Sequence, residues 1–210
     1  MKFKGMTVFG GASKTINEKF YAQGFKLGQI IGQKQMTLIF GIGDNGMMGQ
    51  VFRGALSQKA PIKGITTKEL LELQCEDKSL FKEGEIEIVP DLFVRKFMMF
   101  HDGDAIAVLP GGWGTMDEFA EFSVTIQTKL IQKKPLVFVN LDGFYDPLKE
   151  QLRVMKENGC IDDNKLDFVG FVDRVEDVLP LAEKIAEKLE KQESQRLKKE
   201  VDEMKKKVSV

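Results

Sequence analysis

The amino-acid sequence predicts one α/β domain in which a parallel sheet is covered by helices on both faces. Short apolar runs alternate with amphipathic stretches over most of the chain, as expected when each strand is followed by a helix. Glycine-rich turns follow three of these runs. With 210 residues and 42% hydrophobic content, the chain is long enough for one α/β core and short for two.

The predicted strands are runs that are too short for helices and apolar enough to be buried on both faces. They are Met6–Phe9, Met36–Phe40, Ile62–Ile65, Ile86–Val89, Ala105–Leu109, Pro135–Asn140 and Leu166–Val172.

The stretches between the runs carry apolar residues at spacings of three and four, which is the helical period. Residues 67–85 are harder to interpret and are expected to form one short helix and a mobile loop. A last helix is expected from Val175 onward. The other predicted helices are Asn17–Gln33, Gly46–Lys59, Leu92–Phe100, Thr115–Lys129 and Tyr145–Glu157.

The C-terminal part becomes rich in lysine and glutamate from Glu183, so we expect a domain at residues 1–180 and a charged helical extension at 181–210. Leu197, Val201, Met204 and Val208 follow one another at spacings of four, three and four, which suits a heptad seam. Barely two heptads are too few to predict a coiled coil. The sequence therefore favours an extended, solvated helix or a frayed tail.

Composition excludes several classes of function. The formal net charge is −1 and the isoelectric point is about 6.0, so nucleic acid is not an expected partner. No run approaches the roughly 20 apolar residues of a membrane span, and the N-terminus lacks the apolar stretch of a signal peptide. We therefore expect a cytoplasmic protein without a membrane partner.

The few cysteines and histidines give no sign of a metal or redox site. Cys75 and Cys160 are too far apart for a metal-binding or redox motif. His101 is the single histidine, and it is expected at a surface or a helix end rather than in catalysis.

The segment Leu109–Glu118 reads Leu-Pro-Gly-Gly-Trp-Gly-Thr-Met-Asp-Glu and joins a predicted strand to a predicted helix. If Thr115 opens that helix, its free N–H groups attract an anion such as phosphate. Thr115 and Glu118 also have the spacing of a capping box, in which Glu118 is only a cap. Three glycines in four residues favour the phosphate site, because a plain strand-to-helix turn rarely needs them.

Two further glycine loops, Phe9–Ser13 and Gly41–Gly46, follow the first and second predicted strands. Since the carboxyl ends of parallel strands meet at one edge of a sheet, all three loops are expected to converge there. The second loop also matches Gly-x-Gly-x-x-Gly, which alone is weak support for dinucleotide binding.

Arg95 and Lys96 lie near the start of a predicted helix, where the helix dipole favours anions rather than cations. Their position suggests an external phosphate or carboxylate, which a guanidinium can hold in a bidentate manner. The alternative is that both are ordinary surface residues.

Arg95-Lys96 followed by Pro110-Gly-Gly-Trp-Gly-Thr-Met-Asp-Glu118 resembles the Lonely Guy (LOG) family, whose members are cytokinin riboside 5′-monophosphate phosphoribohydrolases. The resemblance extends to Gly43–Gly49, Phe9–Ser13 and Asn140–Tyr145 and covers roughly residues 6–161. The chain departs from the family in its apolar residues 92–94 and in Ile42, where the family has glycine.

The resemblance implies a modified Rossmann fold, a homodimer with the active site near the subunit interface, and hydrolysis of the bond between a base and ribose 5′-phosphate in adenine-type or cytokinin ribotides. No cofactor and no metal are implied. Arg95 and Glu118 fall on the family's catalytic positions, with Glu118 ionised to stabilise the ribosyl cation or activate water. The remaining site residues, expected to bind a nucleoside monophosphate, are Gly11, Ser13, Gly43, Gly46, Lys96, Gly111, Gly112, Gly114 and Thr115.

Two other functions compete with this interpretation. A non-catalytic nucleotide carrier or sensor on the same fold needs the glycine turn but has no use for a carboxylate facing the sugar. The presence of both Arg95 and Glu118 therefore favours the enzyme. A lysine decarboxylase is rejected, because nothing in the sequence supplies a lysine for pyridoxal phosphate with a partner for its ring nitrogen.

Overall fold

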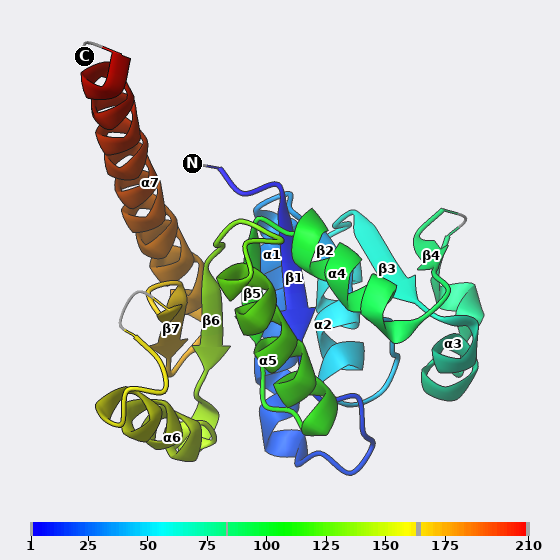
Figure 1. Ribbon diagram of the computed structural model, residues 1–210. Helices are drawn as coiled ribbons and strands as arrows, with labels where there is room; N and C mark the ends of the chain where they lie inside the picture. Colours follow the sequence, from blue (N-terminus) through cyan, green and yellow to red (C-terminus); the bar gives the residue numbers. More distant parts are fainter. Residues whose placement is uncertain (1, 83, 163–164, 209–210) are drawn as a thin grey trace.

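The computed structural model describes residues 2–82, 84–162 and 165–208. Its strands are β1 (Gly5–Phe9), β2 (Thr37–Phe40), β3 (Ile62–Thr66), β4 (Ile86–Ile88), β5 (Ala105–Val108), β6 (Leu136–Val139) and β7 (Val169–Val172). They form one sheet in the order β4-β3-β2-β1-β5-β6-β7, and all neighbouring strands are parallel (Figure 1). The chain runs outward from β1 to β4 and then returns to β5 on the other side of β1. The carboxyl ends of β1 and β5 therefore lie at the switch point where such folds bind ligands.

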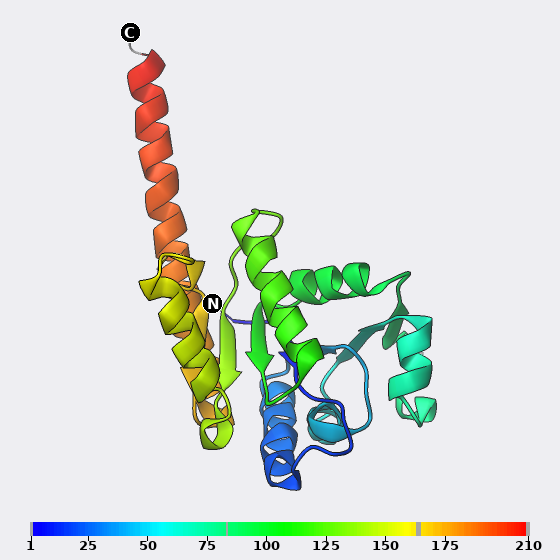
Figure 2. The ribbon, with the colours of Figure 1, turned by 60° about the horizontal axis from the view of Figure 1, so that its bottom comes forward.

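Helices cover both faces of the sheet, so the predicted fold class is confirmed (Figures 1 and 2). One face packs against α1 (Tyr21–Gln33), α2 (Gly46–Ser57) and α7 (Val178–Val208). The other packs against α4 (Leu92–Asp102), α5 (Trp113–Gln127) and α6 (Asp146–Glu157). The short helix α3 (Lys68–Gln74) lies beside β4 at one edge. Single 3₁₀ turns occupy Glu18–Phe20, Lys78–Leu80, Leu141–Gly143 and Val175–Asp177.

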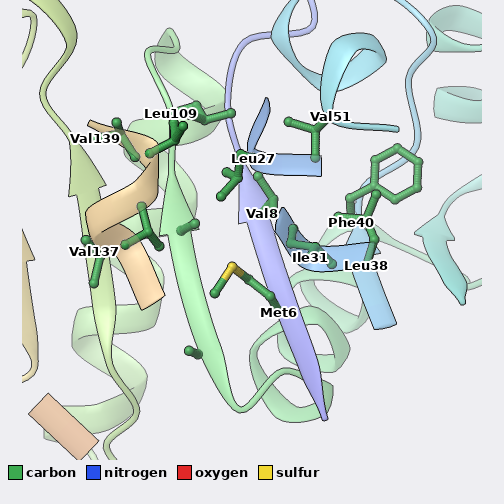
Figure 3. Close-up of a cluster of buried hydrophobic side chains, with 14 of the residues drawn as sticks. Met6, Val8, Leu27, Ile31, Leu38, Phe40, Val51, Leu109, Val137 and Val139 are labelled. Atoms are coloured by element: carbon green, nitrogen blue, oxygen red, sulfur yellow. The ribbon is translucent and has the colours of Figure 1, made fainter. Parts of the chain in front are cut away.

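The core follows the two-residue period of the strands. In β1, Met6 and Val8 face α1 and α2, whereas Phe9 faces α4 and α5, and all three are at most 1% exposed. Figure 3 shows the first of these layers, in which Leu27 and Ile31 of α1 lie over β1 and β2. Burial on both faces explains why the strands read as continuous apolar runs.

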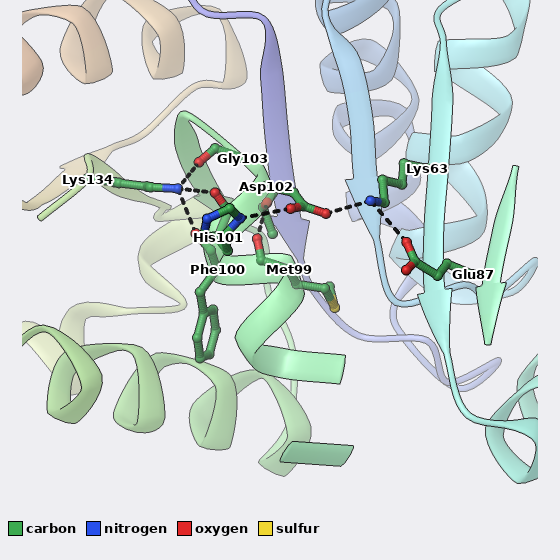
Figure 4. Close-up of polar contacts among 9 residues, drawn as sticks. Lys63, Glu87, Met99, Phe100, His101, Asp102, Gly103 and Lys134 are labelled. Atoms are coloured by element: carbon green, nitrogen blue, oxygen red, sulfur yellow. Dashed lines mark hydrogen bonds and ion pairs between the residues drawn. The ribbon is translucent and has the colours of Figure 1, made fainter. Parts of the chain in front are cut away.

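The last turn of α4 is fixed by polar contacts at the amino-terminal edge of the sheet (Figure 4). The Lys134 ammonium donates to the carbonyl oxygens of Phe100 and Gly103 at 2.9 and 2.6 Å, which satisfies the helix C-terminus. Lys63 pairs with Asp102 at 2.7 Å and with Glu87 at 3.0 Å. These contacts tie α4 to its neighbours and thereby fix the helix that carries Arg95.

Several predicted boundaries differ from the structure by a few residues, and three of these differences have a clear local cause. Helix α5 begins at Trp113 rather than Thr115, because Gly112 already has the extended backbone of an N-cap (φ −101°, ψ −145°). Asn17 does not begin α1 but caps a 3₁₀ turn by accepting from Lys19 N–H at 3.1 Å. Strand β7 is shorter than predicted, because Val169 N–H donates to Leu166 O in a turn that precedes the strand.

Helix α7 is continuous across the boundary that we predicted at residue 180. Its first turns belong to the core, where Ala182, Ile185 and Ala186 are buried and Leu189 still packs against their cluster. Beyond Leu189 the helix leaves the body of the molecule (Figures 1 and 2). In the part of the chain that the structure describes, no helix is long and apolar enough to cross a membrane.

Candidate functional site

A cavity of about 830 Å³ lies at the carboxyl edge of the sheet, where the loops after β1, β2 and β5 meet. This is the convergence that the glycine loops predict. Of the predicted site residues, those that line the cavity are Gly11, Ser13, Arg95, Gly111, Gly112, Gly114, Thr115 and Glu118.

The N-terminus of α5 presents unused hydrogen-bond donors to this cavity. Its N-cap, Gly112, has no side chain to cap the helix, and its carbonyl accepts only from Met116 N–H at 3.1 Å. Within the described residues, the N–H groups of Trp113, Gly114 and Thr115 have no acceptor. Three aligned amides at the positive end of a helix dipole form a site for an anion.

Close packing fixes the turn before α5. A Cβ atom on Gly111 would overlap Thr115 Oγ1 and lie 2.9 Å from Gly11 N, so only glycine fits. Gly11 N–H donates to Pro110 O at 3.0 Å, and the buried Tyr145 hydroxyl donates to Leu109 O at 2.6 Å. The two glycine loops are therefore joined before any ligand binds.

The alternative interpretation, a capping box formed by Thr115 and Glu118, is wrong. Because α5 begins two residues earlier, Thr115 is its third residue, and its side chain lies against Gly111 rather than over the helix end. Glu118 is the sixth residue of α5 and is therefore too far along the helix to reach the N-cap at Gly112. Its carboxyl group faces Arg95 instead.

Arg95 is a buried residue of the sheet edge rather than a surface cation, with 9% of the residue exposed. Its Nε donates to Ile65 O at 3.0 Å and its Nη2 to Gly41 O at 2.9 Å. Gly41 permits this approach, since a Cβ there would occupy the position of Nη2. Nη1 is left to face Glu118 Oε1 at 3.8 Å. The guanidinium is thus held by the carboxyl ends of β2 and β3 and presents one nitrogen to the site.

Glu118 is almost fully buried, and burial raises its pKa to about 8 even though Arg95 acts in the opposite direction. Burial likewise lowers the pKa of Arg95 more than Glu118 raises it. Both shifts favour the uncharged form of the side chain. At 3.8 Å the attraction between the two groups does not offset the loss of water around two charges. Burial therefore favours the protonated form of Glu118 in the free protein, whereas the family resemblance implies the ionised form in catalysis.

Lys96, Gly43 and Gly46 do not line the cavity, contrary to their predicted role. Successive helical residues point roughly 100° apart, so Lys96 faces α5 when Arg95 faces the site. There it pairs with Asp117 at 2.7 Å and with Glu121. Gly46 packs against the carbonyl oxygens of Gly11 and Ser13, so its role is to hold two loops together.

One wall of the cavity comes from residues that the sequence analysis did not select, namely Leu73, Gln74 and Glu76. They belong to the segment expected to contain a mobile loop, of which residue 83 lies outside the described residues, but Asp44 ties residues 76 and 77 to the second glycine loop. The Asp44 carboxylate accepts from the backbone N–H groups of Glu76 and Asp77 at 2.9 and 3.0 Å. The sequence signal was the acidic residue in the second glycine loop, whose second carboxylate oxygen is free to bind a distant segment because the neighbouring Asn45 donates only to the first.

Ile42 follows Gly41, whose carbonyl oxygen accepts from Arg95, and its side chain contacts the segment that carries this wall. It has φ +64°, a left-handed conformation that β-branched residues rarely adopt. Its side chain is 2% exposed and packs with Leu71 and Cys75 beneath α3. The family glycine is thus replaced by a residue that anchors the wall.

Among the residues that the structure describes, no three His, Cys, Asp or Glu side chains are placed to hold an ion.

Known proteins resemble this chain in sequence and in fold. The rice protein named probable cytokinin riboside 5′-monophosphate phosphoribohydrolase LOGL1 (Oryza sativa subsp. japonica) is 33% identical over 147 residues, which are 70% of this chain and 64% of the rice protein. The chain thus spans just under two thirds of that relative. Cytokinin riboside 5′-monophosphate phosphoribohydrolase LOG1 of Arabidopsis thaliana is 28% identical over 194 residues, 89% of each chain.

Solved structures share the fold at lower identity. The Moco carrier protein from Chlamydomonas reinhardtii has a TM-score of 0.62 and 16% identity, and the match covers 87% of this chain and 97% of that one. The molybdenum cofactor binding protein from the phototrophic bacterium Rippkaea orientalis has a TM-score of 0.60 and 18% identity, with 87% and 98% covered.

A family model described as "possible lysine decarboxylase" matches residues 48–182, well over half of the sequence. This match agrees with the phosphoribohydrolase relatives and with the Arg-Lys and Pro-Gly-Gly-x-Gly-Thr motifs, and the chain therefore belongs to the family that this model describes, the Lonely Guy family.

Proposed function

We propose that the protein hydrolyses the N-glycosidic bond of adenine-type nucleoside 5′-monophosphates and releases the free base and ribose 5-phosphate. The observation that carries this proposal is that the Arg95–Glu118 pair and the free amides of α5 face one cavity. A phosphate held by the amides fixes one end of the substrate, and that binding energy positions the sugar beside the carboxyl group.

The chemistry requires few protein groups. The C1′–N bond breaks with its electron pair going to the base, which takes up a proton, and water adds to C1′. Glu118 in its ionised form stabilises the positive charge at the sugar and accepts the proton of the attacking water. Arg95 holds Glu118 in place and favours its ionised form, because its Nη1 is the positive charge nearest to the carboxyl group.

Release of base from AMP and from isopentenyladenosine monophosphate tests the proposal directly. Purified protein is incubated with each ribotide, and both base and ribose 5-phosphate are quantified. Equal amounts of the two products support hydrolysis.

The alternative is a carrier or sensor that binds a nucleotide without cleaving it. The two solved structures described above, which share the fold, are of a carrier protein and a binding protein for the molybdenum cofactor. If neither ribotide is cleaved but both raise the melting temperature, the carrier function replaces the enzyme.

Replacing Gly111 by alanine is expected to abolish the stabilisation that ribose 5-phosphate gives to the wild-type protein. The new Cβ overlaps Thr115 Oγ1 and pushes the turn away from the amides. Gly114→Ala is the matched control, since a Cβ there meets no atom within 4 Å and the melting temperature of the free protein should not change. Thermal unfolding with and without ribose 5-phosphate measures both effects, and a full ligand-induced shift in Gly111→Ala would contradict the phosphate site.

We propose that the base lies at the α3 side of the cavity, and the strand order supports this position. The phosphate site follows β5, Arg95 touches the ends of β2 and β3, and β1 lies between β5 and β2. A ligand that begins at α5 and passes Glu118 therefore ends near Leu73 and Gln74. Within the described residues the Gln74 carboxamide makes no hydrogen bond, so its donor and its acceptor are available to the edge of a heterocycle.

Gln74→Ala is expected to lower kcat/KM for AMP by about tenfold, the effect of one lost hydrogen bond. Affinity for ribose 5-phosphate, which lacks the base, should stay unchanged. Glu72→Ala on the same helix is the control, because Glu72 is exposed and does not line the cavity. Equal losses for AMP and ribose 5-phosphate would show that Gln74 does not contact the base.

We further propose that the protein is a homodimer formed through the outer face of α4 and α5. Large apolar side chains on this face are exposed, among them Leu92 (51%), Phe93 (62%) and Val124 (57%). Phe93→Ser should give a smaller assembly mass than the wild type in light scattering. Val154→Ser on α6 should leave the mass unchanged, and equal masses for all three proteins would rule out this interface.

A further inference from the structure

The second half of α7 is a helix without a covering layer. Contacts with the body end at Leu189, and the rest of the helix projects past the amino-terminal edge of the sheet, away from the cavity (Figures 1 and 2). Leu197, Val201 and Met204 are 49%, 48% and 65% exposed on it. Spacings of four and three put these three side chains on one stripe of the helix.

The stripe fits one kind of coiled coil. If Val201 is an a position, Leu197 and Met204 are d positions. A β-branched residue at a with leucine at d favours two parallel strands. The flanking positions carry one sign each, because Glu193 and Glu200 are g positions and Lys198 and Lys205 are e positions.

We propose that this half of α7 pairs with the same segment of a second copy as a parallel, in-register, two-stranded coiled coil. In that arrangement Glu193 faces Lys198 of the partner subunit, and Glu200 faces Lys205 of the partner subunit. Both contacts join opposite charges. An antiparallel pair would place g beside g and e beside e, so glutamate would face glutamate and lysine would face lysine. Charge complementarity therefore selects a second copy in parallel orientation.

The short seam is compatible with pairing, because the helix is already formed. Initiation is the costly step in helix formation, and here α7 continues directly out of the folded body. Arg196 pairs with Glu193 at 2.7 Å and with Glu200 at 3.6 Å in the same helix, which supports the helix over the stretch that pairs. The contact buries few side chains, so we expect it to be weak and concentration-dependent. It leaves both cavities open, since they lie at the opposite edge of the sheet.

Disulfide cross-linking of the full chain tests the orientation. Ser194 is the a position before Val201, and in the parallel pair the two copies of Ser194 lie opposite each other. With the exposed Cys160 replaced by serine, Ser194→Cys is expected to form a covalent dimer under mild oxidation. Gln195→Cys, one residue along and on the outside, is the matched control and should stay monomeric on a non-reducing gel. Absence of the Ser194→Cys dimer, or equal yields from both variants, would overturn the proposal.

A charge exchange tests the pairing without a disulfide bond. The double variants Glu193→Lys/Glu200→Lys and Lys198→Glu/Lys205→Glu each face like charges in a homodimer, whereas their mixture restores every opposite pair. We therefore expect loss of the tail contact in each variant alone and its recovery on mixing, measured by energy transfer between dyes attached at position 195, which lies outside the seam. Circular dichroism checks that α7 stays helical. Because the dyes report only tail contacts, the result is independent of an α4–α5 interface and of catalysis. Equal transfer in all samples would exclude the coiled coil.

Discussion

Replacing Glu118 by glutamine is expected to reduce base release by about a thousandfold, within the range of a lost acid–base or charge-stabilising group. Glutamine has nearly the same shape but can neither carry negative charge beside the sugar nor accept the proton of water. Binding of ribose 5-phosphate should survive, because the α5 amides remain in place. Retained turnover in Glu118→Gln would refute the proposed mechanism while leaving the binding site intact.

The pH dependence gives a second measure of the same residue. The pKa of Glu118 is raised to about 8, and the proposed mechanism uses the ionised form. The kcat/KM of the wild type should therefore rise with pH and level off above about pH 8. An activity that instead falls through this range would assign the protonated form, and hence general acid catalysis, to Glu118.

The same shift couples stability to pH. The pKa of Glu118 lies above its value of 4.5 in the unfolded chain, so its contribution to stability is complete below about pH 4.5 and is lost as the pH rises toward 8. Glu118→Gln has no such loss. Near pH 9 its free energy of unfolding should exceed that of the wild type by about 3–4 kcal/mol, and the two proteins should converge near pH 5. Denaturant unfolding at both pH values measures the difference, and a gap that does not change with pH would contradict the burial of an ionisable carboxyl group.

Arg95→Ala is expected to have the second large effect, on activity and on stability together. It leaves the carbonyl oxygens of Gly41 and Ile65 without their donor and removes the counter-charge of Glu118. We expect a loss of about 2–3 kcal/mol in unfolding free energy and at least about a hundredfold in kcat. The pKa of Glu118 should rise further, because the largest interaction that opposes the effect of burial is then lost. Denaturant unfolding and steady-state kinetics measure the two losses.

Arg95→Lys and Lys96→Gln separate charge from geometry. An ammonium keeps the charge but cannot reproduce the two fixed donors, so Arg95→Lys should recover part of the stability and little of the activity. Lys96→Gln breaks the contacts with Asp117 and Glu121 outside the cavity and should keep most of kcat. Equal kinetic defects at positions 95 and 96 would mean that Lys96 does contact the substrate.

The strands and their glycine loops were predictable, because burial on both faces and turn chemistry both act locally. The convergence of Arg95 and Glu118 at one cavity followed from the strand order that the fold class implies. The sequence could not show that Arg95 faces the cavity while Lys96 faces α5, since this depends on how α4 is rotated against α5. The start of α5 was predicted two residues too far along the chain, because Thr115 and Glu118 have the spacing of a capping box that they do not form. The wall of Leu73 and Gln74 was missed because its anchor, Asp44, lies some thirty residues away in the sequence.

The left-handed backbone of Ile42 affects how ligands enter the site. Relaxing this residue would withdraw its side chain from the cluster under α3 and turn the neighbouring Gly41 carbonyl away from the guanidinium. Packing thus holds a costly local conformation in place, and the binding surface is formed before a ligand arrives. Association should therefore proceed in a single kinetic phase whose rate rises linearly with ligand concentration, with no slower isomerisation following it.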